Sequence, residues 1–215
     1  MGMDLYTLEK PKAVPAAYLR EHSDPGYYRF NVQGMAAMVS LMRAAGVLSD
    51  EPMPEFPPEP RAKDPALQES FRGVMMGKKE ERARLPPDEL KRADAHVEAL
   101  RKATGTRSAD PRKVPAFKFE SNSGWFISPD ECRLIAVAVR AYARQLSGDE
   151  VRAANAASSK ADAKLTAQLA PKLGTQATKL SPSDLGMSKD ELRTWMLDWA
   201  DFNTLASFAG GYEVD

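Results

Sequence analysis

The sequence has 215 residues, of which 43% are hydrophobic and 28% are charged, as is usual for a globular protein with a packed core. Basic and acidic side chains are equal in number, 30 each, and this balance disfavours a dedicated nucleic-acid binder, which needs positive charge to neutralise phosphates. The single cysteine, Cys132, excludes an intramolecular disulfide and a cluster of metal-binding thiolates.

The first predicted helix follows an aromatic segment. Asn31 is a suitable N-cap for a helix over 31–45, in which methionine and valine recur at helical spacing. The next segment, 51–63, is rich in proline and glutamate. Because proline lacks a backbone donor and breaks helices, we expect an extended acidic segment at the surface here.

Residues 64–104 are predicted to form a helical hairpin inserted into a single domain that spans 1–215. Asp64 and Pro65 suit the N-cap and the first turn of one helix, and apolar residues follow at helical spacing. A second helix is predicted over 87–104, with its own apolar stripe. The prolines before it favour a turn between the two helices.

The segment 114–128 is predicted to form a β-hairpin. Phe117 and Phe119 alternate with Lys118, which is typical of a strand that buries the aromatic rings and turns the lysine outward. The partner strand is predicted in "GWFIS", and "SNSG" is predicted to be the turn, because asparagine and glycine accept a positive φ at little cost.

Two helices have complete N-terminal capping signals. In each, a serine N-cap is followed three residues later by a glutamate that returns a hydrogen bond to the backbone of the cap. The two capping boxes are Ser128 with Glu131, for a helix over 129–146, and Ser188 with Glu191, for a helix over 188–209. Both helices have long apolar stripes, so we expect both in the core.

The region 148–187 is rich in alanine and poor in large apolar side chains. It favours a marginal helix that ends before Pro171, followed by a loop. We therefore expect a projecting element or loop that adds little to the core.

The catalytic inventory is small. The histidines are His22 and His96, which are too few and too far apart to suggest a metal site, and no known nucleotide-binding or nucleophile motif occurs. Cys132 falls on the apolar stripe of its helix, which favours packing over reactivity. We therefore expect no catalytic residue, no metal and no cofactor, and the sequence favours a protein that is not an enzyme.

The predicted hairpin turn is the most informative candidate site. Lys118, Ser121, Asn122 and Trp125 combine a charge, small polar groups and an aromatic ring within eight residues. Such a loop can hold a small polar ligand or the backbone of a partner. The structural alternative is a plain turn with Trp125 fixed in the core, and the sequence leaves both interpretations open.

Several short blocks resemble an uncharacterised family of small bacterial and bacteriophage proteins. Its members begin Met-Gly-Met-Asp, contain a Tyr/Phe-Phe-Arg-x-Asn element and Ser-Asn-Asp-Gly-Trp before a helix, and end in Gly-Gly, an aromatic residue and Glu. The similar blocks are "MGMDLY", "YYRFN", "KFESNSGWFISPDEC" and "FNTLASFAGGYEVD". The resemblance implies no reaction.

The family's motif residues map onto separate parts of this chain, and Ser123 stands where the relatives tend to have aspartate. Both terminal blocks are predicted to be short strands that join the central hairpin in one small sheet, backed by the helices over 31–45, 129–146 and 188–209. The mapped positions are Tyr28, Arg29, Asn31, Ser121, Asn122, Gly124, Trp125, Gly210, Gly211 and Glu213.

The sequence as a whole predicts an α+β fold, predominantly helical, with a small antiparallel sheet and the helical-hairpin insertion. No apolar run is long enough to cross a bilayer and the first residues lack a signal-peptide pattern, so we expect a cytoplasmic location.

The favoured function is a non-enzymatic protein that binds another protein, in an immunity-like, antitoxin-like or mobile-element accessory role. An excess of acidic residues over 181–215 suits a basic partner. The alternatives are a binder of a small polar, nucleotide-like ligand in phage anti-defence, and an enzyme that uses carboxylates alone. The candidate ligand- or partner-binding residues are Arg29, Asn31, Lys118, Ser121, Asn122 and Trp125.

Overall fold

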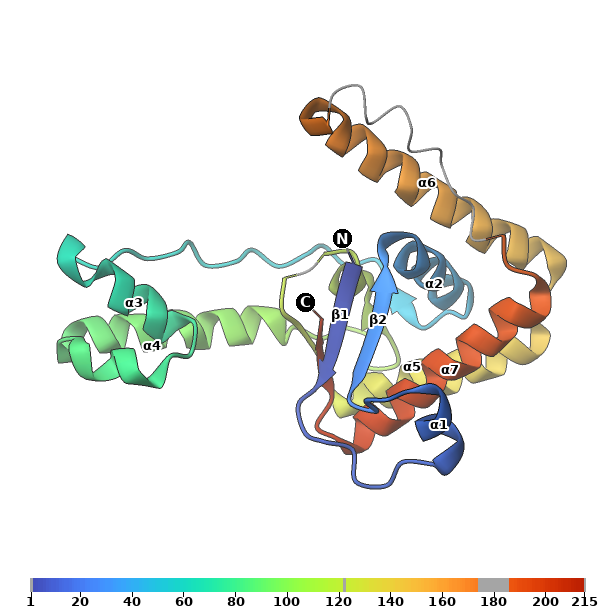
Figure 1. Ribbon diagram of the computed structural model, residues 1–215, viewed down its shortest axis with the longest axis horizontal. Helices are drawn as coiled ribbons and strands as arrows, with labels where there is room; N and C mark the ends of the chain where they lie inside the picture. Colours follow the sequence, from blue (N-terminus) through green and yellow to red (C-terminus); the bar gives the residue numbers. More distant parts are fainter. Residues whose placement is uncertain (1, 122, 174–185, 215) are drawn as a thin grey trace. The chain divides into compact units, whose positions relative to one another are not determined.

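The computed structural model describes residues 2–121, 123–173 and 186–214, and it has the predicted α+β fold, predominantly helical with a small antiparallel sheet (Figure 1). The strands are β1 (Gly2–Thr7), β2 (Tyr27–Asn31), β3 (Leu48–Ser49), β4 (Val114–Pro115), β5 (Trp125–Ile127) and β6 (Tyr212–Val214). The α-helices are α1 (Ala16–Glu21), α2 (Val32–Ala44), α3 (Gln68–Met75), α4 (Pro87–Thr104), α5 (Pro129–Gln145), α6 (Gly148–Leu173) and α7 (Lys189–Phe208). Short 3-10 helices occupy Pro65–Leu67, Lys79–Arg84 and Ala116–Phe119.

The described strands form an antiparallel sheet in the order β2-β1-β6-β5 and a short parallel pair, β3-β4. The two terminal strands lie side by side at the centre of the larger sheet, with Leu5 opposite Val214. The prediction that both ends of the chain join one sheet is therefore confirmed.

The predicted β-hairpin over 114–128 is wrong. In its expected first strand only Val114 and Pro115 are extended, and the next four residues form a 3-10 helix. β5 pairs with β6 instead of with the segment before it, with Trp125 opposite Val214. The alternation of Phe117 and Phe119 therefore reflects one turn of tight helix, in which all of residues 116–119 are buried.

Three helices cover one face of the sheet, as predicted. α2, α5 and α7 bury residues such as Met38, Ile135 and Trp199 against strand residues such as Leu5 and Phe30. The predicted caps of these helices are also confirmed. Asn31 accepts the backbone N–H of Gly34, and both serine capping boxes are complete.

α6 differs from the prediction of an element outside the core. It lies beside α2 and continues past it (Figure 1). Ala154 and Ser158 are fully buried, and Ala154 belongs to the main core cluster. Small side chains let the two helices approach closely, which explains how an alanine-rich segment contributes to packing. The helix also continues through Pro171 to Leu173, and residues 174–185 lie outside the described residues.

Residues Met53–Thr106 form a compact unit of their own, separate from the unit made by Met1–Pro52 and Arg107–Asp215. Within it, α3 packs on α4, and the small core consists of Phe71, Val74, Leu85 and Ala93. The predicted N-cap Asp64 accepts the N–H of Ala66, and α4 has the predicted bounds. The first turns after Asp64 are 3-10 and lead into α3.

The two glycines before β6 have a structural reason. Gly210 and Gly211 both adopt a positive φ, at 79° and 90°. A Cβ atom on Gly211 would lie 2.1 Å from the carbonyl oxygen of Ile127, which is backbone of the neighbouring strand and cannot move aside. Glycine at this position is therefore required for β5 and β6 to pair.

We predict that Gly211→Ala strongly destabilises the protein, because the methyl group collides with β5. Gly46→Ala is the matched control, since Gly46 also has a positive φ of 73° but has nothing within 4 Å of the added Cβ. The control should lose about 1–2 kcal/mol, the usual cost of the left-handed conformation, and Gly211→Ala clearly more. Chemical denaturation measures both, and equal losses would contradict the collision.

Candidate functional site

Lys118 is buried in the core, which corrects the prediction that it faces outward. Its side chain is 0% exposed, and its ammonium donates to the backbone oxygen of Phe126 and to Oε1 of Glu131, both at 2.8 Å. The prediction failed because the residue lies in a 3-10 helix, where side chains do not alternate between two faces.

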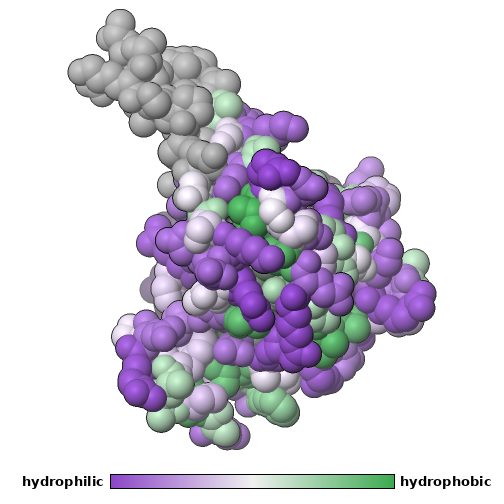
Figure 2. Space-filling view, turned by 90° about the vertical axis from the view of Figure 1, so that its right-hand side faces the viewer, coloured by the Kyte–Doolittle hydropathy of each residue, from purple (hydrophilic) through white to green (hydrophobic). Residues whose placement is uncertain are grey.

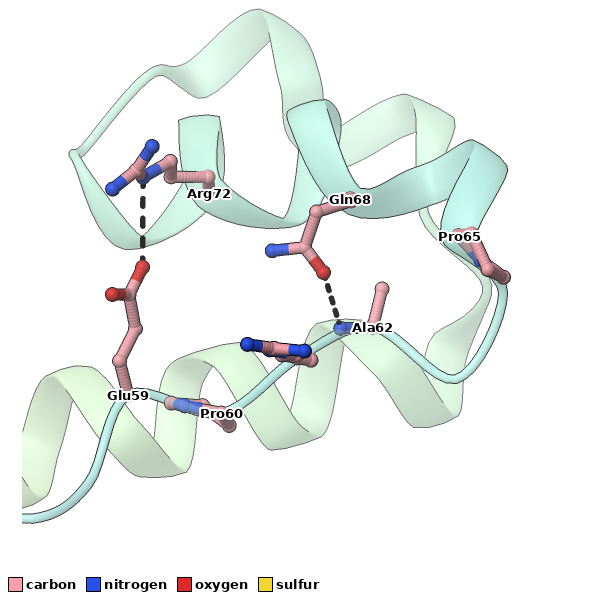
Figure 3. A pocket seen from close by; sticks show the side chains of 7 residues that line it. Glu59, Pro60, Ala62, Pro65, Gln68 and Arg72 are labelled. Atoms are coloured by element: carbon pink, nitrogen blue, oxygen red, sulfur yellow. Dashed lines mark hydrogen bonds and ion pairs between the residues drawn. The ribbon is translucent and has the colours of Figure 1, made fainter.

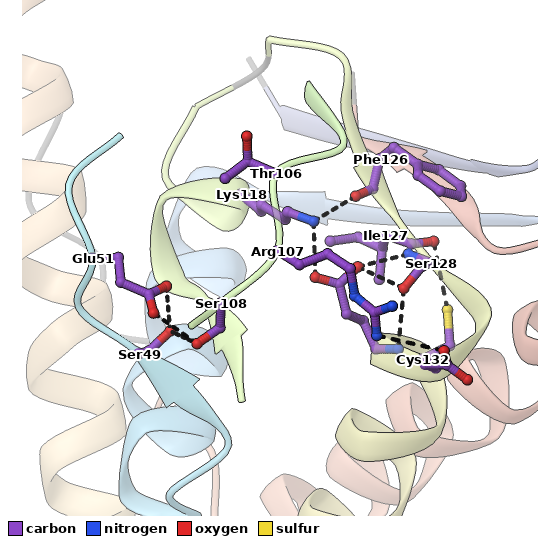
Figure 4. A network of polar contacts seen from close by, with 12 residues as sticks. Ser49, Glu51, Thr106, Arg107, Ser108, Lys118, Phe126, Ile127, Ser128 and Cys132 are labelled. Carbon is purple, nitrogen blue, oxygen red and sulfur yellow. Dashed lines mark hydrogen bonds and ion pairs between the residues drawn. The ribbon is translucent and has the colours of Figure 1, made fainter. Parts of the chain in front are cut away.

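Glu131 has two roles at once, and the two side chains that it contacts, Lys118 and Ser128, are labelled in Figure 4. One carboxylate oxygen pairs with Lys118, and the other accepts the backbone N–H and the hydroxyl of Ser128, at 2.8 Å each, in the capping box of α5. Burial lowers the pKa of Lys118, and the charge of Glu131 opposes that shift. The pair is a structural link between the 3-10 helix, β5 and α5.

Ser121 and Ser123 are tied to the same region. The indole N–H of the fully buried Trp125 donates to the hydroxyl of Ser121 at 2.9 Å, and Ser123 also donates to Ser121. Trp125 also packs on Phe117, with ring centroids 4.7 Å apart. Asn122 lies outside the described residues. These contacts favour the structural interpretation of Ser121 and Trp125.

The remaining predicted residues, Arg29 and Asn31, lie on the edge strand β2. Asn31 uses its side-chain oxygen to cap α2. The Arg29 side chain is 63% exposed, and its Nε lies 3.5 Å from the carboxylate of Asp4 on β1. Of the predicted set, the described structure therefore leaves Arg29 as the side chain that is most clearly open to a partner.

The sheet has an outer face that the three core helices do not cover. Register places Tyr27, Tyr6, Glu213 and Phe126 in one row across the four strands, next to the pair of Arg29 with Asp4. Tyr6 is 50% exposed and stands beside Tyr27, with ring centroids 5.1 Å apart. We call these residues the outer sheet face: Asp4, Tyr6, Tyr27, Arg29, Phe126 and Glu213.

The polar groups of the outer sheet face hold one another in place. Tyr27 donates a hydrogen bond to the Asp4 carboxylate, which also attracts Arg29. This hydrogen bond raises the pKa of Tyr27. Two further apolar side chains are exposed: Leu8, which follows β1, and Phe208, which is the last residue of α7.

A second polar cluster joins α1 to α7, and sequence reasoning missed it. His22 Nε2 lies 2.6 Å from Oδ1 of Asp198, and the hydroxyl of Tyr28 donates to Oδ2 at 2.8 Å. His22 and Asp198 are 176 residues apart in the sequence, so no local spacing could have revealed the pair. The cluster lies at the surface, with the two side chains 23% and 22% exposed.

Two tyrosines form the buried side of this cluster. Tyr18 stacks on the ring of His22, with centroids 4.2 Å apart. Burial and the charge of Asp198 raise the pKa of both Tyr18 and Tyr28 above the ordinary value. The hydroxyl of Tyr18 is buried and has no hydrogen-bond partner within the described part of the chain.

The unit Met53–Thr106 contains an open hollow of about 660 Å³ between its proline-rich segment and α3 (Figure 3). Arg72 pairs with Glu59 across it at 3.5 Å, and Gln68 accepts the N–H of Ala62. Because these polar groups are paired with one another, they are not available to bind a ligand, and we do not assign a ligand site to the hollow.

The face drawn in Figure 2 is mostly hydrophilic, and its hydrophobic residues occur in small separate groups. Such scattered groups are normal for a protein surface. Among the described residues, no helix is both long and apolar enough to cross a membrane.

Comparison with known proteins finds no match for this chain. No protein-family model matches the chain, and neither the curated proteins nor the solved structures give a significant match.

We predict that Lys118→Met destabilises the protein by about 3–5 kcal/mol, because it leaves the Glu131 charge buried without its cationic partner. The double variant Lys118→Met/Glu131→Gln should recover part of that loss, since it removes both charges. Urea denaturation of both variants and the wild type measures the difference. A single variant within about 1 kcal/mol of the wild type would contradict a buried charged pair.

Proposed function

We propose that this chain is a non-enzymatic, cytosolic binding protein that docks another protein on its outer sheet face. The observation that supports this most directly is the difference between the two faces of the sheet. One face is buried by α2, α5 and α7, and the other presents Tyr6 and Arg29 to solvent.

The residue types on this face suit protein recognition. Tyrosine and arginine are enriched among the residues that contribute most to protein–protein affinity. The contacts of Asp4 with Tyr27 and Arg29 restrict these side chains before binding, so less conformational entropy is lost when a partner docks. A sheet is also a rigid support for such a row of side chains.

The charge of the expected partner follows from the same residues. The outer sheet face contains both signs of charge, so the partner should present a mixed surface. The excess of acidic residues over 181–215 is a poor reason to expect a strongly basic partner. Three of these acidic side chains already have contacts within the chain. Glu191 completes the α7 capping box, Asp198 contacts His22 and Tyr28, and Asp201 pairs with Arg140.

The small-ligand alternative is supported less well than a protein partner. It relied on Arg29, Lys118, Asn122 and Trp125, and the buried positions of Lys118 and Trp125 keep their polar groups within the protein. An immunity-like, antitoxin-like or mobile-element role remains the finer proposal, and a gene neighbourhood that encodes the partner would support it.

We predict that Tyr6→Ser/Arg29→Glu weakens partner binding by at least about 30-fold, the equivalent of one residue worth about 2 kcal/mol. The control Val137→Ser/Arg133→Glu makes the same charge change and likewise replaces an exposed hydrophobic side chain by serine, on the exposed side of α5. The partner is first purified with the wild-type chain from its native host, and its affinity for each variant is then measured by calorimetry.

Both double variants should melt at nearly the wild-type temperature, because all four substituted side chains are at the surface. Loss of binding in both variants, or in neither, would contradict docking on the outer sheet face. Recovery of the wild-type chain without a stoichiometric protein partner would contradict the proposed function.

A further inference from the structure

Three side chains that the proposed function does not use meet where α1 ends against α7. The ligand atoms of Glu21, His22 and Asp198 all lie within 4.8 Å of one another. We propose that these residues form a binding site for a divalent transition-metal ion such as Zn²⁺.

The donor set suits this class of ion. One imidazole nitrogen and two carboxylate oxygens are ligands of Zn²⁺, Mn²⁺ and their neighbours, whereas Ca²⁺ and Mg²⁺ prefer oxygen alone. Glu21 is exposed and His22 is half-buried, so the site opens to solvent on one side. Three protein ligands with water in the remaining position is a common arrangement for zinc.

The surrounding residues already orient the ligands. Tyr28 donates to the second oxygen of Asp198, which leaves Oδ1 directed at His22. Tyr18 stacks on the imidazole and fixes the plane of its ring. Such outer contacts are typical of metal sites, where they hold each ligand in the orientation that coordination requires.

The Tyr18 hydroxyl is a second, independent observation. It belongs to a residue that is only 7% exposed, it lies within the electrostatic reach of Asp198, and it has no hydrogen-bond partner among the described residues. A buried hydroxyl without a partner is unfavourable. Among the described residues, it is thus an unpaired polar group on the ring that stacks on His22.

The distance between His22 and Asp198 is compatible with a metal after a small movement. Their ligand atoms are 2.6 Å apart, whereas two ligands at about 2.1 Å from a tetrahedral ion lie somewhat farther from each other. His22 is the C-cap of α1, a helix of six residues, and Glu21 is its last residue, so two of the three ligands are neighbours at one helix end.

The test uses the whole chain, freed of any affinity tag, with Zn²⁺ in calorimetry and Co²⁺ in absorption spectroscopy. We expect one ion per chain, and at least about tenfold weaker binding in His22→Gln and in Glu21→Gln. His96→Gln is the matched control, because His96 lies on α4 and is the second of the two histidines in the sequence. The control should bind as the wild type does.

Glu21→Gln keeps the test decisive if changes at the half-buried His22 affect folding, because Glu21 is exposed. Wild-type affinity in Glu21→Gln and His22→Gln would overturn the proposal. So would a loss of binding in His96→Gln, or the absence of binding by the wild type at millimolar Zn²⁺. Metal binding that survives Tyr6→Ser/Arg29→Glu would separate this site from the proposed docking face.

Discussion

The buried pair of Lys118 and Glu131 is the interaction on which the centre of the structure depends. A charge in the core is acceptable only when it is paired and hydrogen-bonded, and here both conditions hold, with side-chain exposures of 0% and 2%. The lysine can satisfy this requirement only if the Phe126 carbonyl and the start of α5 are both in place. The 3-10 helix, β5 and α5 must therefore pack together cooperatively. A misplaced β5 would leave the buried Lys118 ammonium without its Phe126 acceptor.

The position of β5 in turn determines which side chains reach the outer sheet face. With Trp125 and Ile127 turned into the core, Phe126 must point the other way, opposite Glu213. Gly211 permits this pairing because it has no side chain to meet the Ile127 carbonyl. The outward direction of the residues on the outer sheet face thus follows from the packing of the core, and no further interaction is needed to produce it. The same alternation places Tyr6 on the outer face and Leu5 in the core.

Local signals in the sequence were enough to predict the capped helices, because a capping box involves residues only three positions apart. The N-caps Asn31, Ser128 and Ser188 are all where the sequence indicates. The direction of Lys118 was not predictable in this way. Its partner is 13 residues further on, and the apparent strand alternation is equally compatible with a short 3-10 helix. The cluster of His22 with Asp198 depends on the packing of α1 against α7, which no local pattern encodes.

The short sequence motifs contain positions that can be divided by what they do in this chain. Asn31 caps α2, Trp125 fills the core, and Gly211 allows two strands to pair, so each has a structural reason. Arg29 and Glu213 have no structural role of comparable strength, because both are exposed on the outer sheet face. Folding alone would accept many other residues at these two positions. Both lie beside Tyr6 and Tyr27, so the proposed docking of a protein on the outer sheet face would explain why these two positions have charged side chains.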